Sequence, residues 1–278
     1  MLQVPDVIVE PGWLYENLDH PKLIILDATI KKVTSSSLNN SVQEYIKNTL
    51  FFDLKNTFSN QESEFPNTVL DAVTFEKEAQ KLGINQDSCI VVYDQLGIYS
   101  SARVWWLFNL MGFQNIAVLN GGFPVWKSKK YLTEQQQTKS LPQGNFKSSY
   151  ATSLFISKKE VLNSLSNSDV KVVDARSHNR FMGIEPEPRK DLPSGRIPNS
   201  SNIPYTEVLN ECILKSKTEL ESIFKSYTVE TKVLFSCGSG ITASILALAF
   251  RYINKNNFAV YDGSWTEWGS DVSLPKEQ

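Results

Sequence analysis

The sequence predicts an α/β protein of two tandem domains, each with a central, mostly parallel sheet flanked by helices. Two observations support this prediction. Segments of the first half of the chain recur in the second half, and short apolar runs alternate with segments of helical periodicity. Such alternation is typical of a parallel sheet covered on both faces, because parallel strands need long crossover connections.

The repeat is clearest near the end of each half. Ile116–Trp126 (IAVLNGGFPVW) aligns without gaps to Phe258–Trp268 (FAVYDGSWTEW), at an offset of 142 residues. Each copy has an apolar run, an Asn-Gly or Asp-Gly turn and then an aromatic segment. Upstream, Ile90–Phe108 matches Lys232–Phe250: both read as a β-branched run, a glycine-containing turn and a helical apolar pattern.

A third pair of segments completes the repeat. Lys22–Thr29 (KLIILDAT) matches Val170–Ser177 (VKVVDARS), and each is an apolar run that ends at an aspartate. Each half therefore contributes at least three strands with helices between them. The loops after parallel strands meet at one edge of the sheet, and open α/β sheets bind ligands at that edge.

A polar stretch between the repeats predicts a linker. It contains few apolar residues, and a proline and a glycine interrupt it. We expect a first, non-catalytic domain at 1–130, a linker at 131–152 and a second, catalytic domain at 153–278. The alternative is a surface loop within one domain, but the repeat brackets the stretch on both sides.

Composition narrows the possible partners. The 278 residues are 41% hydrophobic and carry a formal net charge of −2, which gives no reason to expect nucleic acid or an anionic membrane as a partner. The longest apolar stretch, Ile241–Phe250, is too short to span a bilayer, and the N-terminus does not read as a secretory signal. The three widely spaced cysteines do not form a disulfide framework, so we expect a cytoplasmic protein. No His/Cys spacing indicates a metal site, and we expect no cofactor.

Cys237 stands where an anionic sulfur would be stabilised. It follows the strand pattern Val233–Phe235 and precedes a helix expected from about Thr242 to Tyr252. Gly238, Ser239 and Gly240 allow a tight turn whose backbone N–H groups face inward, and the helix N-terminus adds partial positive charge. A thiolate there would attack sulfur, and the resulting persulfide needs the same N–H donors. The alternative is a buried structural cysteine.

The motifs resemble a known family. SCGSGITA around Cys237, YDGSWTEW at 261–268, RVWW at 103–106, VVYD at 91–94 and RFMGIEPEPR at 180–189 resemble the tandem-domain sulfurtransferases of the rhodanese superfamily, of the mercaptopyruvate and thiosulfate types. The resemblance covers about Val9 to Gly269. It implies two rhodanese-like folds with the catalytic cysteine in the second alone. The sequence agrees, since Asp94 matches Cys237 in the first repeat.

The resemblance also implies roles for residues around Cys237. Ser239 would assist proton transfer, although a turn residue bonded to its own backbone is an equally good interpretation. Arg180 and Arg189 match the arginines that hold the donor carboxylate, and arginine suits bidentate carboxylate binding. For each arginine the alternative is a salt bridge, with Glu185, Glu187 or Asp174 as partner. Further substrate contacts are expected from the loop residues Gly238, Gly240, Ile241 and Thr242.

The sequence departs from the family at two positions. Mercaptopyruvate enzymes often direct an aspartate and a histidine of the first domain toward the serine of the loop. Here the matching positions are Lys55 and Asn67, so the complete relay of side chains is absent.

We therefore expect a ping-pong sulfurtransferase that uses Cys237. The neutral loop CGSGIT favours 3-mercaptopyruvate as the donor over dianionic thiosulfate. The acceptor would be cyanide or a thiol, for which a thioredoxin-like protein is a candidate. Two alternatives remain open: a thiosulfate:cyanide sulfurtransferase, and a non-catalytic rhodanese-type module that binds a protein.

Overall fold

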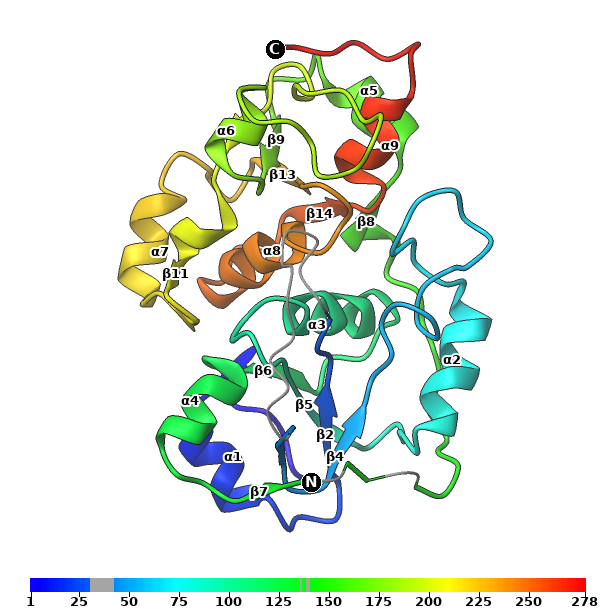
Figure 1. Cartoon of the computed structure of the whole chain (residues 1–278), viewed down its shortest axis with the longest axis vertical. Helices are drawn as coiled ribbons and strands as arrows, with labels where there is room; N and C mark the ends of the chain where they lie inside the picture. The colour runs from blue at the N-terminus through cyan, green and yellow to red at the C-terminus, as the bar shows by residue number, and fades with distance from the viewer. Residues whose placement is uncertain (31–42, 136, 139–140) are drawn as a thin grey trace. The chain divides into compact units, whose positions relative to one another are not determined.

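The computed structural model describes residues 1–30, 43–135, 137–138 and 141–278. The chain divides into two compact units (Figure 1). The first unit consists of Met1–Ser59, Leu70–Tyr150 and Cys212–Leu214, and the second of Asn60–Val69, Ala151–Glu211 and Lys215–Gln278. Each unit thus includes a short segment from elsewhere in the chain. Residues 136, 139 and 140 of the predicted linker lie outside the described residues.

The first unit is built on a parallel sheet with strand order β1-β6-β5-β2-β4. Its strands are β1 (Ile8–Val9), β2 (Leu23–Asp27), β4 (Thr49–Phe51), β5 (Cys89–Tyr93) and β6 (Ile116–Leu119). Its helices are α1 (Pro11–Asn17), α2 (Ala72–Lys81), α3 (Ser101–Leu110) and α4 (Gly122–Ser128). A short antiparallel pair joins β3 (Tyr45–Ile46) to β7 (Thr133–Glu134).

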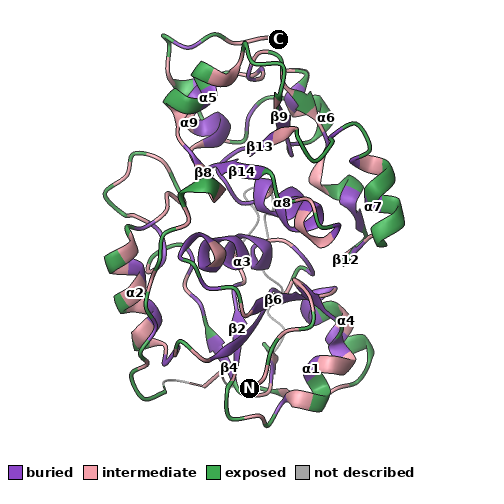
Figure 2. Cartoon of the chain, turned by 180° about the vertical axis from the view of Figure 1, so that it is seen from behind, coloured by how far each residue is buried: buried purple, intermediate pink, exposed green. Residues whose placement is uncertain are grey.

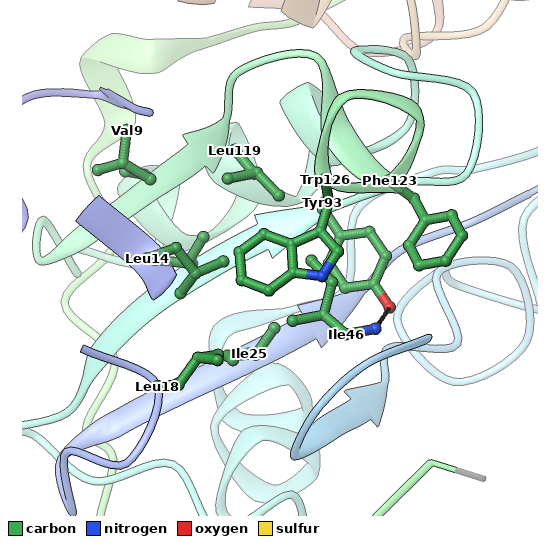
Figure 3. Close-up of a cluster of buried hydrophobic side chains, with 11 residues drawn as sticks. Val9, Leu14, Leu18, Ile25, Ile46, Tyr93, Leu119, Phe123 and Trp126 are labelled. Carbon is green, nitrogen blue, oxygen red and sulfur yellow. Dashed lines mark hydrogen bonds between the residues drawn. The ribbon is translucent and has the colours of Figure 1, made fainter. Parts of the chain in front are cut away.

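Buried side chains cover both faces of this sheet. On one face, residues of α1 and α4 pack on the strands, as Leu14 and Trp126 show in Figure 3. Tyr93 lies in the same cluster, and its hydroxyl accepts a hydrogen bond from the Ile46 N–H at 3.3 Å. Elsewhere in the unit Phe75 of α2 packs edge-on against Phe108 of α3. Burial on both sides explains why these strands are apolar throughout.

The second unit repeats this plan, with strand order β10-β9-β13-β14-β8 and parallel pairing. Its strands are β8 (Phe155–Ile156), β9 (Val170–Asp174), β10 (Ser201–Asn202), β13 (Lys232–Ser236) and β14 (Phe258–Tyr261). Its helices are α5 (Lys158–Ser164), α6 (His178–Phe181), α7 (Lys217–Ile223), α8 (Ala243–Tyr252) and α9 (Ser264–Ser270). Smaller elements of this unit are β11 (Leu209–Asn210) and 3-10 turns at Thr152–Leu154 and Tyr205–Val208, while β12 (Ile213–Leu214) belongs to the first unit.

The core of the second unit also has two sides. Figure 2 shows β13, β14 and α8 almost wholly in the colour of buried residues. Trp265 and Trp268 of α9 are 0% exposed and pack in one cluster with β-strand residues. Phe224 and Phe250 pack edge-on, and Phe250 also contacts Phe235 of β13. The tryptophans of this repeat are therefore core residues.

Local sequence fixes several helix starts. Ser157 and Ser216 each precede a glutamate by three positions, and both pairs form capping boxes at α5 and α7. The Asp71 side chain accepts hydrogen bonds from the Val73 and Thr74 N–H groups and caps α2. Such caps satisfy N–H groups that the first turn of a helix leaves without a partner.

Strand register relates the two units residue by residue. Tyr93 of β5 lies opposite Asp27, and Ser236 of β13 lies opposite Asp174. Asp94 and Cys237 each come next, at equivalent points of the two sheets. Between strand and helix the first unit has Asp94–Ser100 and the second has Cys237–Thr242, one residue fewer. The two loops therefore differ in length by one residue, and the predicted α/β repeat and the match of Asp94 to Cys237 are confirmed.

None of the helices in the described part of the chain combines the length and the apolar character needed to cross a membrane.

Candidate active site

Cys237 is the first residue after β13, and α8 begins six residues later at Ala243. It is 1% exposed, yet its surroundings include polar groups. Its N–H donates to the Ser264 hydroxyl at 3.1 Å, and that hydroxyl lies 3.8 Å from the cysteine sulfur. The loop therefore places the sulfur at the carboxyl edge of the sheet, where the sequence predicts it.

The start of α9 holds the backbone of the cysteine loop. The Trp265 N–H donates to the Cys237 carbonyl at 2.9 Å, and the Thr266 N–H donates to the Gly238 carbonyl at 3.0 Å. The Thr266 hydroxyl donates to the Gly238 carbonyl as well. With both carbonyls bound on the α9 side, the backbone conformation at Cys237 is fixed before any substrate arrives.

Arg180 and Arg189 lie beside this loop. A Cβ atom placed on Gly238 would meet Arg180 Nη2 at 3.1 Å and Arg189 Nη1 at 3.7 Å. Both guanidinium groups therefore lie next to the residue that follows Cys237, and any side chain at 238 would crowd them. Their proximity to the loop supports the predicted site, while carboxylate binding by them stays a prediction.

The salt-bridge interpretation of Arg180 also holds. Glu187 is buried, and its carboxylate accepts hydrogen bonds from Arg180 and from Arg176. Arg176 in turn pairs with Asp174 at 2.7 Å, and both side chains are at most 2% exposed. The alternating charges form one chain from the end of β9 to the cysteine loop, buried except at Arg180, whose side chain is 18% exposed. Arg180 is thus held in place by Glu187 while its guanidinium contacts the loop.

Ser239 receives two hydrogen bonds from side chains. Arg189 Nη2 donates to its Oγ at 3.0 Å, and Asn67 Nδ2 donates to the same oxygen at 3.1 Å. Asn67 also donates to the Ser239 carbonyl at 3.2 Å. Asn67 is the position where the family resemblance implies a histidine. Its contact with Ser239 shows that the segment Asn60–Val69 reaches the candidate site within the second unit.

The remaining predicted contact residues complete the turn into α8. Gly240 has φ of 79°, a left-handed conformation that favours glycine. Its carbonyl accepts from the Ser244 hydroxyl at 3.1 Å. Ile241 is 5% exposed, and its carbonyl accepts from the Ser244 N–H. The Thr242 carbonyl accepts from the Ile245 N–H at 3.1 Å, so Thr242 is the N-cap of α8.

The equivalent loop of the first unit holds a carboxylate. Asp94 is 0% exposed, and its oxygens accept hydrogen bonds from the N–H groups of Leu96, Tyr99 and Ser101 at 2.8–3.0 Å. The Ser101 hydroxyl donates as well, at 2.7 Å. Burial raises the pKa of Asp94, and these hydrogen bonds oppose the shift. The loop of this scaffold therefore directs three backbone N–H groups at acceptor oxygens of the side chain that follows the strand.

The other two cysteines differ from Cys237 in their setting. Cys89 lies inside β5, and burial raises the pKa of its thiol to about 11. A thiol with this pKa is a poor nucleophile at neutral pH. Cys212 belongs to a short segment of the first unit and is partly exposed. Neither lies between a strand of a five-stranded sheet and a helix, as Cys237 does.

Sequence reasoning missed two contributions to the site. The Asp262 carboxylate accepts a hydrogen bond from the Val69 N–H at 2.9 Å, so it anchors the segment Asn60–Val69 in addition to any role in its own turn. The Ser264 hydroxyl contacts Cys237. The repeat held a signal for the second residue, because Gly122 stands at the matching position of the first half.

Comparison with known proteins places this geometry in context. A family model described as a rhodanese-like domain matches residues 10–129 and 157–271. A 3-mercaptopyruvate sulfurtransferase of Escherichia coli is 33% identical over 97% of each chain. A mitochondrial thiosulfate/3-mercaptopyruvate sulfurtransferase of Arabidopsis thaliana is 34% identical over 97% of this chain and 78% of its own. The crystal structure of SseA from Escherichia coli, a 3-mercaptopyruvate sulfotransferase, superposes with a TM-score of 0.83 at 29% identity, covering 94% of this chain and 99% of that one.

Proposed function

Since this chain belongs to the rhodanese family and is a sulfurtransferase, we propose that it transfers the sulfur of 3-mercaptopyruvate through a persulfide on Cys237. The thiolate of Cys237 attacks the donor sulfur, a sulfur–sulfur bond forms, and the carbon–sulfur bond of the donor breaks. Pyruvate leaves as its enolate and takes a proton from water. A thiolate or cyanide then attacks the outer sulfur and restores the Cys237 thiolate.

The Asp94 loop is the observation that supports the persulfide most directly. A carboxylate oxygen of Asp94 is two bonds from its Cβ, and the outer sulfur of a cysteine persulfide is also two bonds from Cβ. The first unit therefore displays a hydrogen-bond acceptor at the reach that a persulfide of Cys237 would have, bound by three backbone N–H groups. By strand and helix register, the corresponding donors of the second loop are the N–H groups of Ser239, Ile241 and Ala243.

The flanking arginines favour a carboxylate donor. Arg180 and Arg189 both border Gly238, so a donor with its sulfur at Cys237 can place a carboxylate between them. The loop from Cys237 to Thr242 carries no charged side chain of its own. Thiosulfate, a dianion without a carboxylate, would use this arrangement less well.

The proposal also covers the sulfur acceptor, the compartment and the domain boundaries. The acceptor is a thiol, for which a thioredoxin-like protein is our candidate, or cyanide. We assign the reaction to the cytoplasm and expect neither nucleic acid nor a membrane as a partner. The domain boundaries that we propose remain 1–130 and 153–278, with 131–152 between them. The family model agrees with a junction in this region, since its two matches leave 130–156 uncovered.

Mass spectrometry of the intact protein tests the proposal. Protein treated with stoichiometric 3-mercaptopyruvate should gain the mass of one sulfur atom, and Cys237→Ala should gain none. Cys89→Ala is the matched control and should gain sulfur like the wild type. Absence of any mass gain in the wild type would overturn the proposal.

Donor preference separates the two sulfurtransferase types. Arg189→Ala should lower kcat/KM for 3-mercaptopyruvate about 100-fold, because a charged hydrogen-bonding partner of the carboxylate is removed. Turnover of thiosulfate should be slower than that of 3-mercaptopyruvate in the wild type. Faster turnover of thiosulfate would instead favour a thiosulfate:cyanide sulfurtransferase. No persulfide from either donor would favour a protein-binding module.

A further inference from the structure

Ser264 stands at the meeting point of β14, α9 and the cysteine loop. Its side chain is 0% exposed. The hydroxyl oxygen accepts a hydrogen bond from the Cys237 N–H at 3.1 Å. The same hydroxyl lies 2.8 Å from the Tyr261 carbonyl and 3.8 Å from the Cys237 sulfur, and it can donate to either. One buried hydroxyl therefore contacts both the backbone and the sulfur of the nucleophile.

The backbone of Ser264 is in a conformation that favours glycine. Its φ is 51°, in the left-handed region, where a Cβ atom crowds the neighbouring carbonyl. In the first unit the matching residue is Gly122, with φ of 53°. A Cβ on Gly122 would come within 2.3 Å of the Gly97 carbonyl oxygen, so that unit has no room for a side chain. The catalytic unit retains a serine where the same backbone would accommodate glycine without strain.

A strained residue that persists beside a reactive group suggests a functional reason. From these contacts we infer that Ser264 is a positioning residue for the sulfur of Cys237. Its hydroxyl fixes the cysteine backbone, and it turns from the Tyr261 carbonyl to the sulfur when the sulfur becomes anionic. A charged acceptor forms the stronger hydrogen bond, so deprotonation itself favours the turn. This inference rests on the proposed role of Cys237.

Other charged groups also face the loop. The guanidinium groups of Arg180 and Arg189 approach it at Gly238, and Asp262 lies two residues before Ser264 with its carboxylate on the Val69 N–H. These groups stay in place when the Ser264 hydroxyl is removed. A change in the reactivity of Cys237 in such a variant therefore reports on the hydroxyl itself.

The test follows the alkylation of Cys237 by iodoacetamide as a function of pH, with the Cys237 peptide quantified by mass spectrometry and no sulfur donor present. In Ser264→Ala and Ser264→Gly the pH midpoint of alkylation should rise by about 0.5–1 unit, as expected when an anion loses one hydrogen bond. The rate of persulfide formation from 3-mercaptopyruvate at pH 7 should fall about 3- to 10-fold. Ser264→Gly should be more stable than Ser264→Ala, because glycine relieves the left-handed conformation and so offsets part of the cost of the lost hydrogen bonds.

Ser59→Ala is the matched control. Ser59 is also a buried serine, 3% exposed, whose hydroxyl donates to the Leu54 carbonyl at 2.7 Å in the first unit. Its loss should lower stability and leave the alkylation midpoint unchanged. If both Ser264 variants retain the wild-type midpoint and persulfide rate, the inference is wrong. If the midpoint shifts but wild-type protein forms no persulfide, the proposed function fails while the contact between Ser264 and Cys237 is upheld.

Discussion

Asp94 follows β5 in the first unit, and Cys237 follows β13 in the second, at equivalent registers. Both lead through a glycine-containing turn into a buried helix. In the first unit the carboxyl group of the side chain itself accepts hydrogen bonds from the backbone N–H groups of the loop. In the second unit a cysteine stands at that place, and we propose that the outer sulfur of its persulfide meets the corresponding N–H groups. On this proposal the shared backbone supplies the donors, and one side chain decides between a buried carboxyl group and a reactive sulfur.

The strand neighbouring each loop shows a second difference. β2 ends at Asp27 and β9 ends at Asp174, and each aspartate is followed two positions later by a residue that hydrogen-bonds it. For Asp27 this residue is Thr29, which is neutral. For Asp174 it is Arg176, which continues through Glu187 to Arg180. In the second unit the charge of the buried aspartate is therefore balanced by an arginine, and the series of ion pairs continues to the candidate site.

The largest expected effect tests this difference in charge. Asp174→Asn leaves the guanidinium of Arg176, which is 1% exposed, with Glu187 as its remaining carboxylate partner. Breaking a buried ion pair on one side costs about 3–5 kcal/mol of unfolding free energy. Urea denaturation at pH 7 measures the loss. The matched variant Asp27→Asn should not lose stability, and an equal loss in both would contradict the comparison.

A gain in stability is expected at Asp27. Burial raises the pKa of Asp27 from 3.8 to about 6, with a smaller contribution from Asp94, while hydrogen bonds from Thr29 oppose the shift. The folded state therefore favours the protonated carboxyl. The protonated carboxyl contributes its full stabilisation of the folded state below about pH 3.8. The contribution is lost as the pH rises through about 6, which lowers the free energy of unfolding by about 3 kcal/mol.

Asp27→Asn does not ionise and should avoid this loss. At pH 7 its unfolding free energy should exceed that of the wild type by up to about 3 kcal/mol, and the advantage should shrink toward pH 4. Urea denaturation at pH 4, 5.5 and 7 provides the measurement. An advantage that does not change with pH would show that Asp27 is ionised equally readily in both states.

A smaller loss is expected at the first-unit loop. Asp94→Ala removes the acceptor of three backbone N–H groups and of the Ser101 hydroxyl. We expect a loss of about 2 kcal/mol, because relief of carboxylate burial offsets part of the cost of the unpaired donors. Thermal and urea unfolding report the loss, while persulfide formation at Cys237 should be unchanged. Unaltered stability would show that the loop does not need its carboxylate.

The smallest effect concerns Asn67, in the segment Asn60–Val69 of the second unit. Asn67→Gly preserves the φ of 62° and removes the amide that donates to Ser239. Loss of one such hydrogen bond should lower kcat/KM for 3-mercaptopyruvate about 5-fold, equivalent to about 1 kcal/mol. Glu64→Gln, an exposed change in the same segment, is the control and should leave turnover unaltered.

Several features of the site were predictable because their signals are local. Cys237 lies between a strand and a helix, and the glycines around Ser239 indicate a turn. Arg180 and Arg189 belong to one motif that follows β9, so they were expected at the same edge of the sheet. The hydrogen-bond and ion-pair partners of these residues were harder to predict from the sequence. Glu187 was one of three acidic candidates for the arginines, and spacing alone could not select it.

The sequence by itself determined the α/β class, the internal repeat and the single cysteine at a sheet edge, because periodicity and turn residues act over a few neighbouring positions. Only the tertiary structure decided which side chains meet there. Arg189 and Ser239 are 50 positions apart, and Asn67 and Ser239 are 172 apart. Such contacts arise when strand pairing brings distant loops to one edge, and no local pattern in the chain encodes them.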